Sequence, residues 1–77
     1  MAKKLQELRQ AAGLSQSQLA EKAEMSVRSL QHYERGTIEF DNARIDTLLK
    51  VCIALNCRLE DIIENQTYLE LLKRVPK

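Results

Sequence analysis

Three side chains of the sequence have chemistry suited to catalysis or metal binding, namely His32, Cys52 and Cys57. A zinc site needs four ligands in closely spaced pairs, whereas these cysteines lie five residues apart and accompany a single histidine. Cys52 falls on an apolar stripe, which indicates a small core side chain rather than an activated nucleophile. Since the sequence also has no phosphate-binding glycine loop, it predicts no metal, no cofactor and no enzymatic activity.

The composition is that of a small globular protein in a reducing compartment. The chain has 77 residues, of which 44% are hydrophobic and 30% charged, with a formal net charge of +1. No apolar run approaches the length of a membrane span, the N-terminus is too polar for a signal peptide, and two cysteines do not make a disulfide scaffold. We therefore expect a cytoplasmic protein without a membrane partner.

Helical periodicity organises the N-terminal half. Leu5, Leu8 and Ala12 recur at spacings of three and four, which predicts a helix over 3–12 that ends at Gly13. Two further helices follow. Ser15 and Gln18 form a capping-box pattern for a helix that ends near Ala23, and Ser26 is the N-cap of a helix that ends at Gly36. The side chains expected to face inward are Leu19, Ala20, Ala23, Val27, Leu30 and Tyr33.

The C-terminal half is also helical. We expect 37–42 to be a loop with Ile38 and Phe40 tucked against the core, and Asp41 or Asn42 to cap a fourth helix that ends at Asn56. The stripe expected to be buried on that helix consists of Ile45, Leu48, Leu49, Cys52 and Leu55. A last helical segment covers 59–75, with a break possible near 65–67, where Asn and Thr weaken a helix.

The closeness of the second and third helices carries the strongest functional signal. Two helices joined by a turn of three or four residues must cross steeply, and the small side chains of Ala20 and Ala23 permit a close approach. Leu19 and Leu30 can then meet in the angle between the helices. Such a rigid crossed pair lets the second helix enter the major groove of DNA while the first spans the phosphates.

Residues 5–63 resemble the phage-repressor and Cro type of helix-turn-helix domain, the Xre family. The matching positions are Leu8-Arg9, Gly13-Leu14-Ser15-Gln16, Leu19-Ala20, Ser26, Leu30, Tyr33-Glu34-Arg35-Gly36, Leu48-Leu49 and Ala54-Leu55. Two positions depart from the family's pattern: Glu24 stands where the turn usually has Gly, and Asn42-Ala43 stand where the loop usually has Pro. The first departure makes a left-handed backbone at the turn less favourable.

The resemblance implies an all-α, compact five-helix, lambda-repressor-like fold that binds double-stranded operator DNA, usually as a homodimer. We expect one domain over 1–77, with a core at 5–63 and a helical extension at 66–75. Within the helix at 26–35, the positions that contact bases in the family are Val27, Arg28 and His32, with Gln31 a secondary candidate. The position that contacts phosphate is Gln16, and further candidates for backbone contacts are Ser17, Ser29, Thr37, Asn42 and Arg44.

The resemblance also gives Glu34 a structural role. In the family this carboxylate pairs with the arginine of the first helix, here Arg9, as an internal ion pair. A catalytic role for Glu34 is therefore the weaker interpretation. Leu30 and Tyr33 are expected in the core rather than at the DNA.

Two functions remain open from the sequence. The first is a transcriptional regulator, most simply a repressor; a restriction–modification controller or a phage immunity regulator would be variants of it. The second is an antitoxin-type module that neutralises a partner protein and regulates its own operon. The apolar stretch 68–75 motivates the second function, because it could fold onto the core, form a dimer interface or bind a partner protein.

Overall fold

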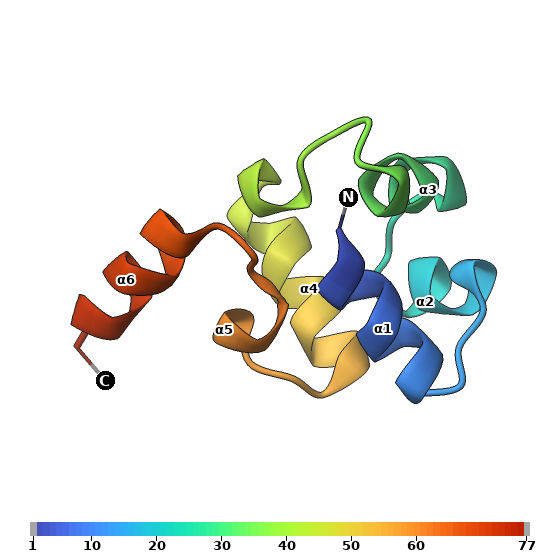
Figure 1. The fold of residues 1–77 in the computed structure, drawn as a ribbon. Helices are drawn as coiled ribbons and strands as arrows, with labels where there is room; N and C mark the ends of the chain where they lie inside the picture. Colours follow the sequence, from blue (N-terminus) through green and yellow to red (C-terminus); the bar gives the residue numbers. More distant parts are fainter. Residues whose placement is uncertain (1, 77) are drawn as a thin grey trace.

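The computed structural model describes residues 2–76, and all regular secondary structure over that range is helical (Figure 1). Its elements are α1 (Lys3–Ala11), α2 (Gln16–Lys22), α3 (Val27–Arg35), the 3-10 turn η1 (Phe40–Asn42), α4 (Ile45–Leu55), α5 (Leu59–Ile62) and α6 (Gln66–Arg74). The predicted all-α class is confirmed. Helices α1 to α5 surround one core, and α6 follows them.

Local sequence signals set most of the helix ends. The Ser15 hydroxyl accepts the N–H of Gln18, whose side chain in turn accepts the N–H of Ser15, so the predicted capping box is present. Ser26 caps α3 in the same way, through the N–H of Ser29. Gly36 ends α3 with a φ of 81°, and Asn56 ends α4 with a φ of 52°, as predicted for left-handed C-terminal residues.

The core is aliphatic and lies between the first five helices. The largest fully buried side chains are Leu5, Leu19, Leu30, Ile62 and Val51. Tyr33 packs edge-on against Phe40, with ring centroids 5.4 Å apart and an interplanar angle of 73°. This aromatic pair fixes the chain between α3 and α4. Ile38, by contrast, is 48% exposed, so the expectation that it would be tucked in was wrong.

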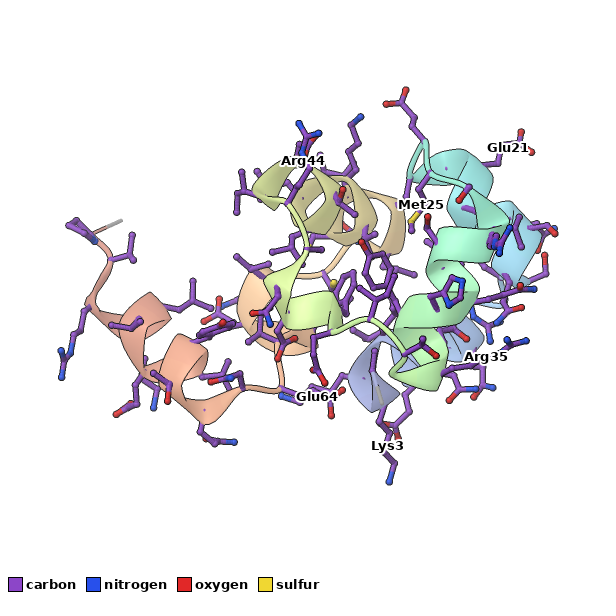
Figure 2. All side chains as sticks on the ribbon, turned by 90° about the horizontal axis from the view of Figure 1, so that it is seen from above. Lys3, Glu21, Met25, Arg35, Arg44 and Glu64 are labelled. Carbon is purple, nitrogen blue, oxygen red and sulfur yellow. The ribbon has the colours of Figure 1, made fainter. Side chains whose placement is uncertain are left out.

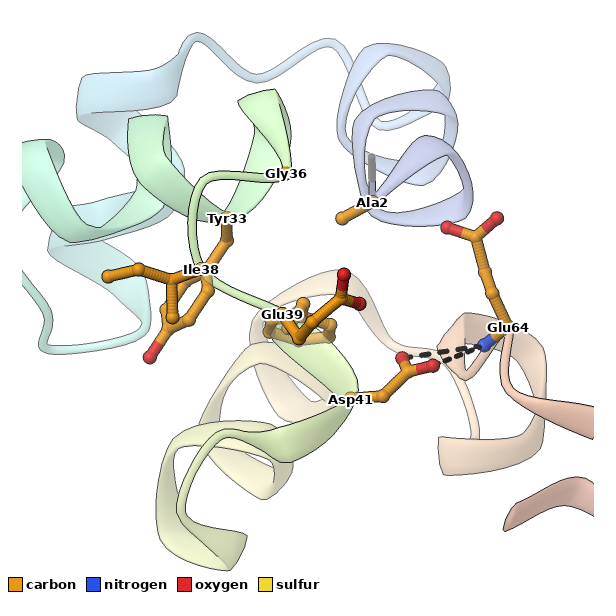
Figure 3. Close-up of a pocket in the computed structure, with 8 residues that line it drawn as sticks. Ala2, Tyr33, Gly36, Ile38, Glu39, Asp41 and Glu64 are labelled. Atoms are coloured by element: carbon orange, nitrogen blue, oxygen red, sulfur yellow. Dashed lines mark hydrogen bonds between the residues drawn. The ribbon is translucent and has the colours of Figure 1, made fainter. Parts of the chain in front are cut away.

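The predicted cap of the fourth helix was wrong. Neither Asp41 nor Asn42 caps α4, which begins after Arg44 without a side-chain cap, because burial of Phe40 winds these residues into the turn η1. The Asp41 carboxylate instead accepts the N–H group of Glu64 (Figure 3) and that of Asn65. Asp41 therefore connects η1 to the start of α6 and does not cap α4.

The buried stripe predicted for α4 was only partly correct. Leu48 and Cys52 are buried, but Ile45 is 61% exposed and Leu49 is 47% exposed. Apolar residues occupy more than half of the circumference of α4, and the core covers only the side that carries Val51. The apolar pattern therefore identified the helix correctly but not the limits of its buried face.

The break expected near 65–67 is present and occupies 63–65. Beyond it, α6 stands away from the other helices (Figure 1), and none of its residues is buried. Asn65 caps the helix at the N–H of Tyr68, and the Tyr68 hydroxyl donates a hydrogen bond to the Asn42 side chain. These hydrogen bonds hold the start of α6, and Leu69 and Leu72 farther along the helix pack, partly buried, against the core.

The turn between α2 and α3 contains a strained residue. Glu24 has a φ of 56°, the conformation for which glycine is preferred, and its carboxylate lies 3.2 Å from Lys50 Nζ at the surface. We expect Glu24→Gly to be more stable than Glu24→Ala by about 1 kcal/mol, since both lose the ion pair but only Ala keeps the strain. Urea unfolding of the two variants measures this difference. Equal stability would show that the backbone at this turn is unstrained.

Candidate nucleic-acid interface

Helices α2 and α3 form a rigid crossed pair. Ala20 and Ala23 are 1% and 2% exposed, so the two backbones approach closely, and Leu19 and Leu30 are fully buried beside them. The turn closes with a hydrogen bond from the N–H of Met25 to the carbonyl of Ala20, at 2.9 Å. This packing sets the direction of α3 without any contribution from the side chains on its exposed face.

A buried ion pair attaches α3 to the first helix. Arg9 Nε donates to Glu34 Oε2 at 2.7 Å, and Arg9 Nη2 donates to Oε1 at 3.2 Å, so the expected pair is present and bidentate. The two side chains are 12% and 3% exposed. Arg9 Nη1 also donates to the carbonyl of Leu14 at 2.8 Å, which holds the loop before α2. Short charge-assisted bonds of this kind are among the strongest in proteins.

Gln16 extends this network to the second helix. Its Nε2 donates to Glu34 Oε1 at 3.1 Å, and its Oε1 accepts from Gln31 Nε2 at 3.4 Å. The network thus joins α1, the start of α2 and one face of α3. Gln31 and Glu34 lie three residues apart on α3, so their shared face was visible in the sequence. That Gln16 reaches both of them depends on how α2 and α3 cross, which the sequence pattern does not reveal.

The base-contact candidates share one side of α3 but differ in exposure. Arg28 is exposed in the first turn, and Val27 is partly buried against the core. Gln31 and His32 follow Arg28 by three and four residues, which places them on the same side of the helix. His32 is partly buried, and within residues 2–76 its Nδ1 atom is buried without a hydrogen-bond partner.

The candidates for backbone contacts come from four separate places. Gln16 and Ser17 stand at the start of α2; Ser29 lies in α3, where its hydroxyl bonds that of Ser26 at 2.8 Å. Thr37 is exposed directly after α3. Asn42 and Arg44 belong to η1 and the residue before α4, and Figure 2 shows Arg44 well away from Arg35 at the end of α3.

The two cysteines lie together at the end of α4, away from this surface. Burial raises the pKa of the Cys52 thiol to about 12, and the neighbouring Cys57 and Asp61 add to the shift. Burial also raises the pKa of Cys57. Both thiols therefore stay protonated near neutral pH and are poor nucleophiles. Over residues 2–76, no three His, Cys, Asp or Glu side chains converge in an arrangement for a metal ion.

Comparison with known proteins identifies one family. A family model described as helix-turn-helix, of the Cro/C1 type, matches residues 5–62. No curated protein and no solved structure gave a significant match. In the described part of the chain, no helix combines the length and apolar character needed to cross a membrane.

The ion pair generates a prediction about stability. Glu34→Leu leaves the Arg9 guanidinium partly buried without its carboxylate, so we expect a loss of about 3–5 kcal/mol in the free energy of unfolding. The double variant Arg9→Met with Glu34→Leu removes both charges and should recover most of that loss. Urea unfolding of the wild type, the two single variants and the double variant measures the coupling. If the double variant loses the sum of what the two single variants lose in free energy of unfolding, Arg9 and Glu34 do not interact.

Proposed function

The chain belongs to the Cro/C1-type helix-turn-helix (Xre) family of DNA-binding transcription regulators, and we propose that it is a sequence-specific repressor that inserts α3 into the major groove. The observation that carries the proposal is the fixed crossing of α2 and α3, with Arg28 exposed in the first turn of α3. In helix-turn-helix proteins the N-terminal residues of this helix contact the base edges.

Arg28 is the principal base-contacting residue of the proposal. Within residues 2–76 its guanidinium makes no ion pair, so its five N–H donors are available to a base. A guanidinium binds the O6 and N7 atoms of guanine with two parallel hydrogen bonds, which is worth about 1–3 kcal/mol of discrimination. Val27 lies beside it at the start of α3 and is suited to a thymine methyl group.

His32 and Gln31 extend the proposed contact by one helical turn. Because His32 Nδ1 is buried without a partner, a proton there would be an unsatisfied buried donor. The neutral ring is therefore best protonated on Nε2, which then serves as the donor toward DNA. Gln31 uses one amide hydrogen on Gln16, and its second amide hydrogen and its carbonyl oxygen can serve a base.

The proposed phosphate contacts use donors that the fold leaves unoccupied. Gln16 donates one amide hydrogen to Glu34, which leaves the second for a phosphate oxygen. Asn42 accepts from Tyr68 through Oδ1, so its amide hydrogens are available. The other proposed contacts are Ser17, Ser29, Thr37 and Arg44. Arg44 Nε lies 3.3 Å from Asp46 Oδ1, which leaves the two Nη groups of Arg44 for a phosphate. Contacts of this kind set the register of the protein on DNA and carry no sequence information directly.

We propose that two copies bind one operator. A single short helix contacts few base pairs, and a symmetric dimer places two recognition helices about 34–36 Å apart, on successive turns of the major groove. The operator is then a palindrome with half-sites one turn apart.

The second candidate is an antitoxin that binds a partner protein through α6. The observation that favours it is that α6 has an apolar face and no buried residue. An antitoxin of this kind would also bind its own operator, so DNA binding alone does not separate the two functions. Removal of residues 66–77 abolishes partner binding in the antitoxin, and an unchanged interaction would reject α6 as its binding site.

Arg28→Ala tests the base contact. We first expect selection from a random duplex library to yield a palindrome that the wild type binds well above random DNA. A plot of log K against the logarithm of the salt concentration should have a slope of about −0.9 for each phosphate contact. Arg28→Ala should weaken operator binding by about 1–3 kcal/mol and relax the preference at one base pair of each half-site.

Arg58→Ala is the matched control, because it removes the same charge from an exposed side chain at the residue before α5. It should leave sequence preference unchanged. Fluorescence anisotropy on the operator and on single-base variants measures both proteins. If Arg28→Ala keeps the wild-type affinity and selectivity, α3 does not contact bases as proposed; if no duplex is enriched, the helix-turn-helix is a scaffold for another partner.

A further inference from the structure

The two cysteines of the chain lie at the corner where α4 ends. Asn56 follows the last residue of α4 in a left-handed conformation, with a φ of 52° and a ψ of 47°. Its N–H bonds the carbonyl of Ile53 at 3.2 Å, and the N–H of Cys57 bonds the carbonyl of Cys52 at 3.0 Å. This pair of hydrogen bonds is the Schellman motif, in which the side chains at the two ends of the outer bond frequently pack together. The corner therefore brings Cys52 and Cys57 together.

The main-chain hydrogen bond between the two cysteines limits their separation. An N···O distance of 3.0 Å, combined with standard backbone dimensions, places the two Cα atoms no more than about 7 Å apart. Disulfides join Cα atoms that are about 4.4–6.8 Å apart. Burial is the main cause of the raised pKa of each thiol, but each thiol also shifts the pKa of the other, which requires neighbouring sulfur atoms. The corner is therefore close to the geometry that a disulfide requires.

The two thiols differ in their access to solvent. Cys52 belongs to the core and is 6% exposed, whereas Cys57 packs against the edge of the core and is partly exposed. A dissolved oxidant therefore reaches the sulfur of Cys57 first. Because burial raises the pKa of Cys57, this first attack is slow near neutral pH. The next attack, by Cys52 on the modified Cys57, is intramolecular between neighbouring groups, so proximity accelerates it.

We propose that Cys52 and Cys57 form a redox-active dithiol, which a small-molecule disulfide oxidises to a disulfide within the chain. The thiolate of Cys57 attacks one sulfur of the oxidant, releases one small thiol and leaves a mixed disulfide on Cys57. The thiolate of Cys52 then attacks the Cys57 sulfur and releases the second small thiol. The two protein thiols lose two protons and two electrons, and both are taken up as one small-molecule disulfide becomes two thiols.

The disulfide closes the corner between α4 and α5 covalently. Helix α5 begins at Leu59, two residues after Cys57, and a hydrogen bond of 2.9 Å from Lys4 Nζ to the carbonyl of Ile63 attaches its end to α1. A disulfide stabilises the native chain mainly by restricting the unfolded chain. The corner lies well away from α3 (Figure 1), so oxidation raises the stability of the domain without altering the surface proposed to bind DNA.

Equilibration of the full chain with mixtures of oxidised and reduced glutathione tests the proposal without DNA. The loss of two hydrogen atoms in the intact mass measures the fraction of internal disulfide, and hence an equilibrium constant, in buffer and in urea. Because the folded corner holds the thiols together, the constant for the folded chain should exceed that for the unfolded chain at least about tenfold. The oxidised chain should also melt at a temperature higher by about 5 °C or more.

The matched control moves one thiol by one residue. The double variant Cys57→Ser with Arg58→Cys keeps two thiols and nearly the same loop length, but places the second thiol at an exposed position before α5. Its equilibrium constant should gain much less from folding. The comparison of the wild type with its own unfolded chain needs no variant, so it stands even if the control does not fold. A folded constant no larger than the unfolded one, glutathione retained on either cysteine in place of the internal bond, a disulfide between two chains, or an equal gain in a folded control would each overturn the proposal.

Discussion

The ion pair between Arg9 and Glu34 is the interaction on which the proposed DNA-binding surface depends. Glu34 is the one charged residue among those buried in the described chain, and it accepts hydrogen bonds from α1 and α2 while belonging to α3. A charge in this position is stable only when its donors stay in place, because an unpaired buried carboxylate costs several kcal/mol. The pair therefore penalises any arrangement of the three helices that separates Arg9 from Glu34. The pair thus fixes the direction of α3 relative to α1 and α2.

The turn between α2 and α3 acts together with this pair. Small residues at Ala20 and Ala23 allow the close crossing, and Glu24 takes a left-handed conformation so that the chain can reverse in so few residues. The carboxylate on α3 and the strained turn therefore favour the same geometry. Because both constraints lie behind the exposed face of α3, side chains such as Arg28 can vary without changing the position of the helix. Family members can thus recognise different operators on one framework.

The C-terminal half shows the opposite situation, with more apolar side chains than the core can bury. A chain of this size buries only about 60% of the surface that it exposes when unfolded. Helix α4 packs one side against the core and leaves Ile45, Leu49 and Ile53 exposed. Leu71 in α6 and Val75 directly after it are exposed as well. These five aliphatic side chains therefore lie at the surface of the described chain.

The sequence by itself determined several helix ends that depend on neighbours along the chain. Ser15 with Gln18, Ser26, Gly36 and Asn56 set helix ends through bonds within a few residues, and the family pattern identified the Arg9–Glu34 pair and the helix-turn-helix. The tertiary structure decided what depends on distant partners. Asp41 accepts a hydrogen bond at the start of α6 and does not cap α4, because the burial of Phe40 places Asp41 in η1. Leu49 is exposed because, in the described part of the chain, no helix covers that side of α4. Periodicity shows that a face is apolar, but only the packed arrangement of the helices shows which part of that face has a partner.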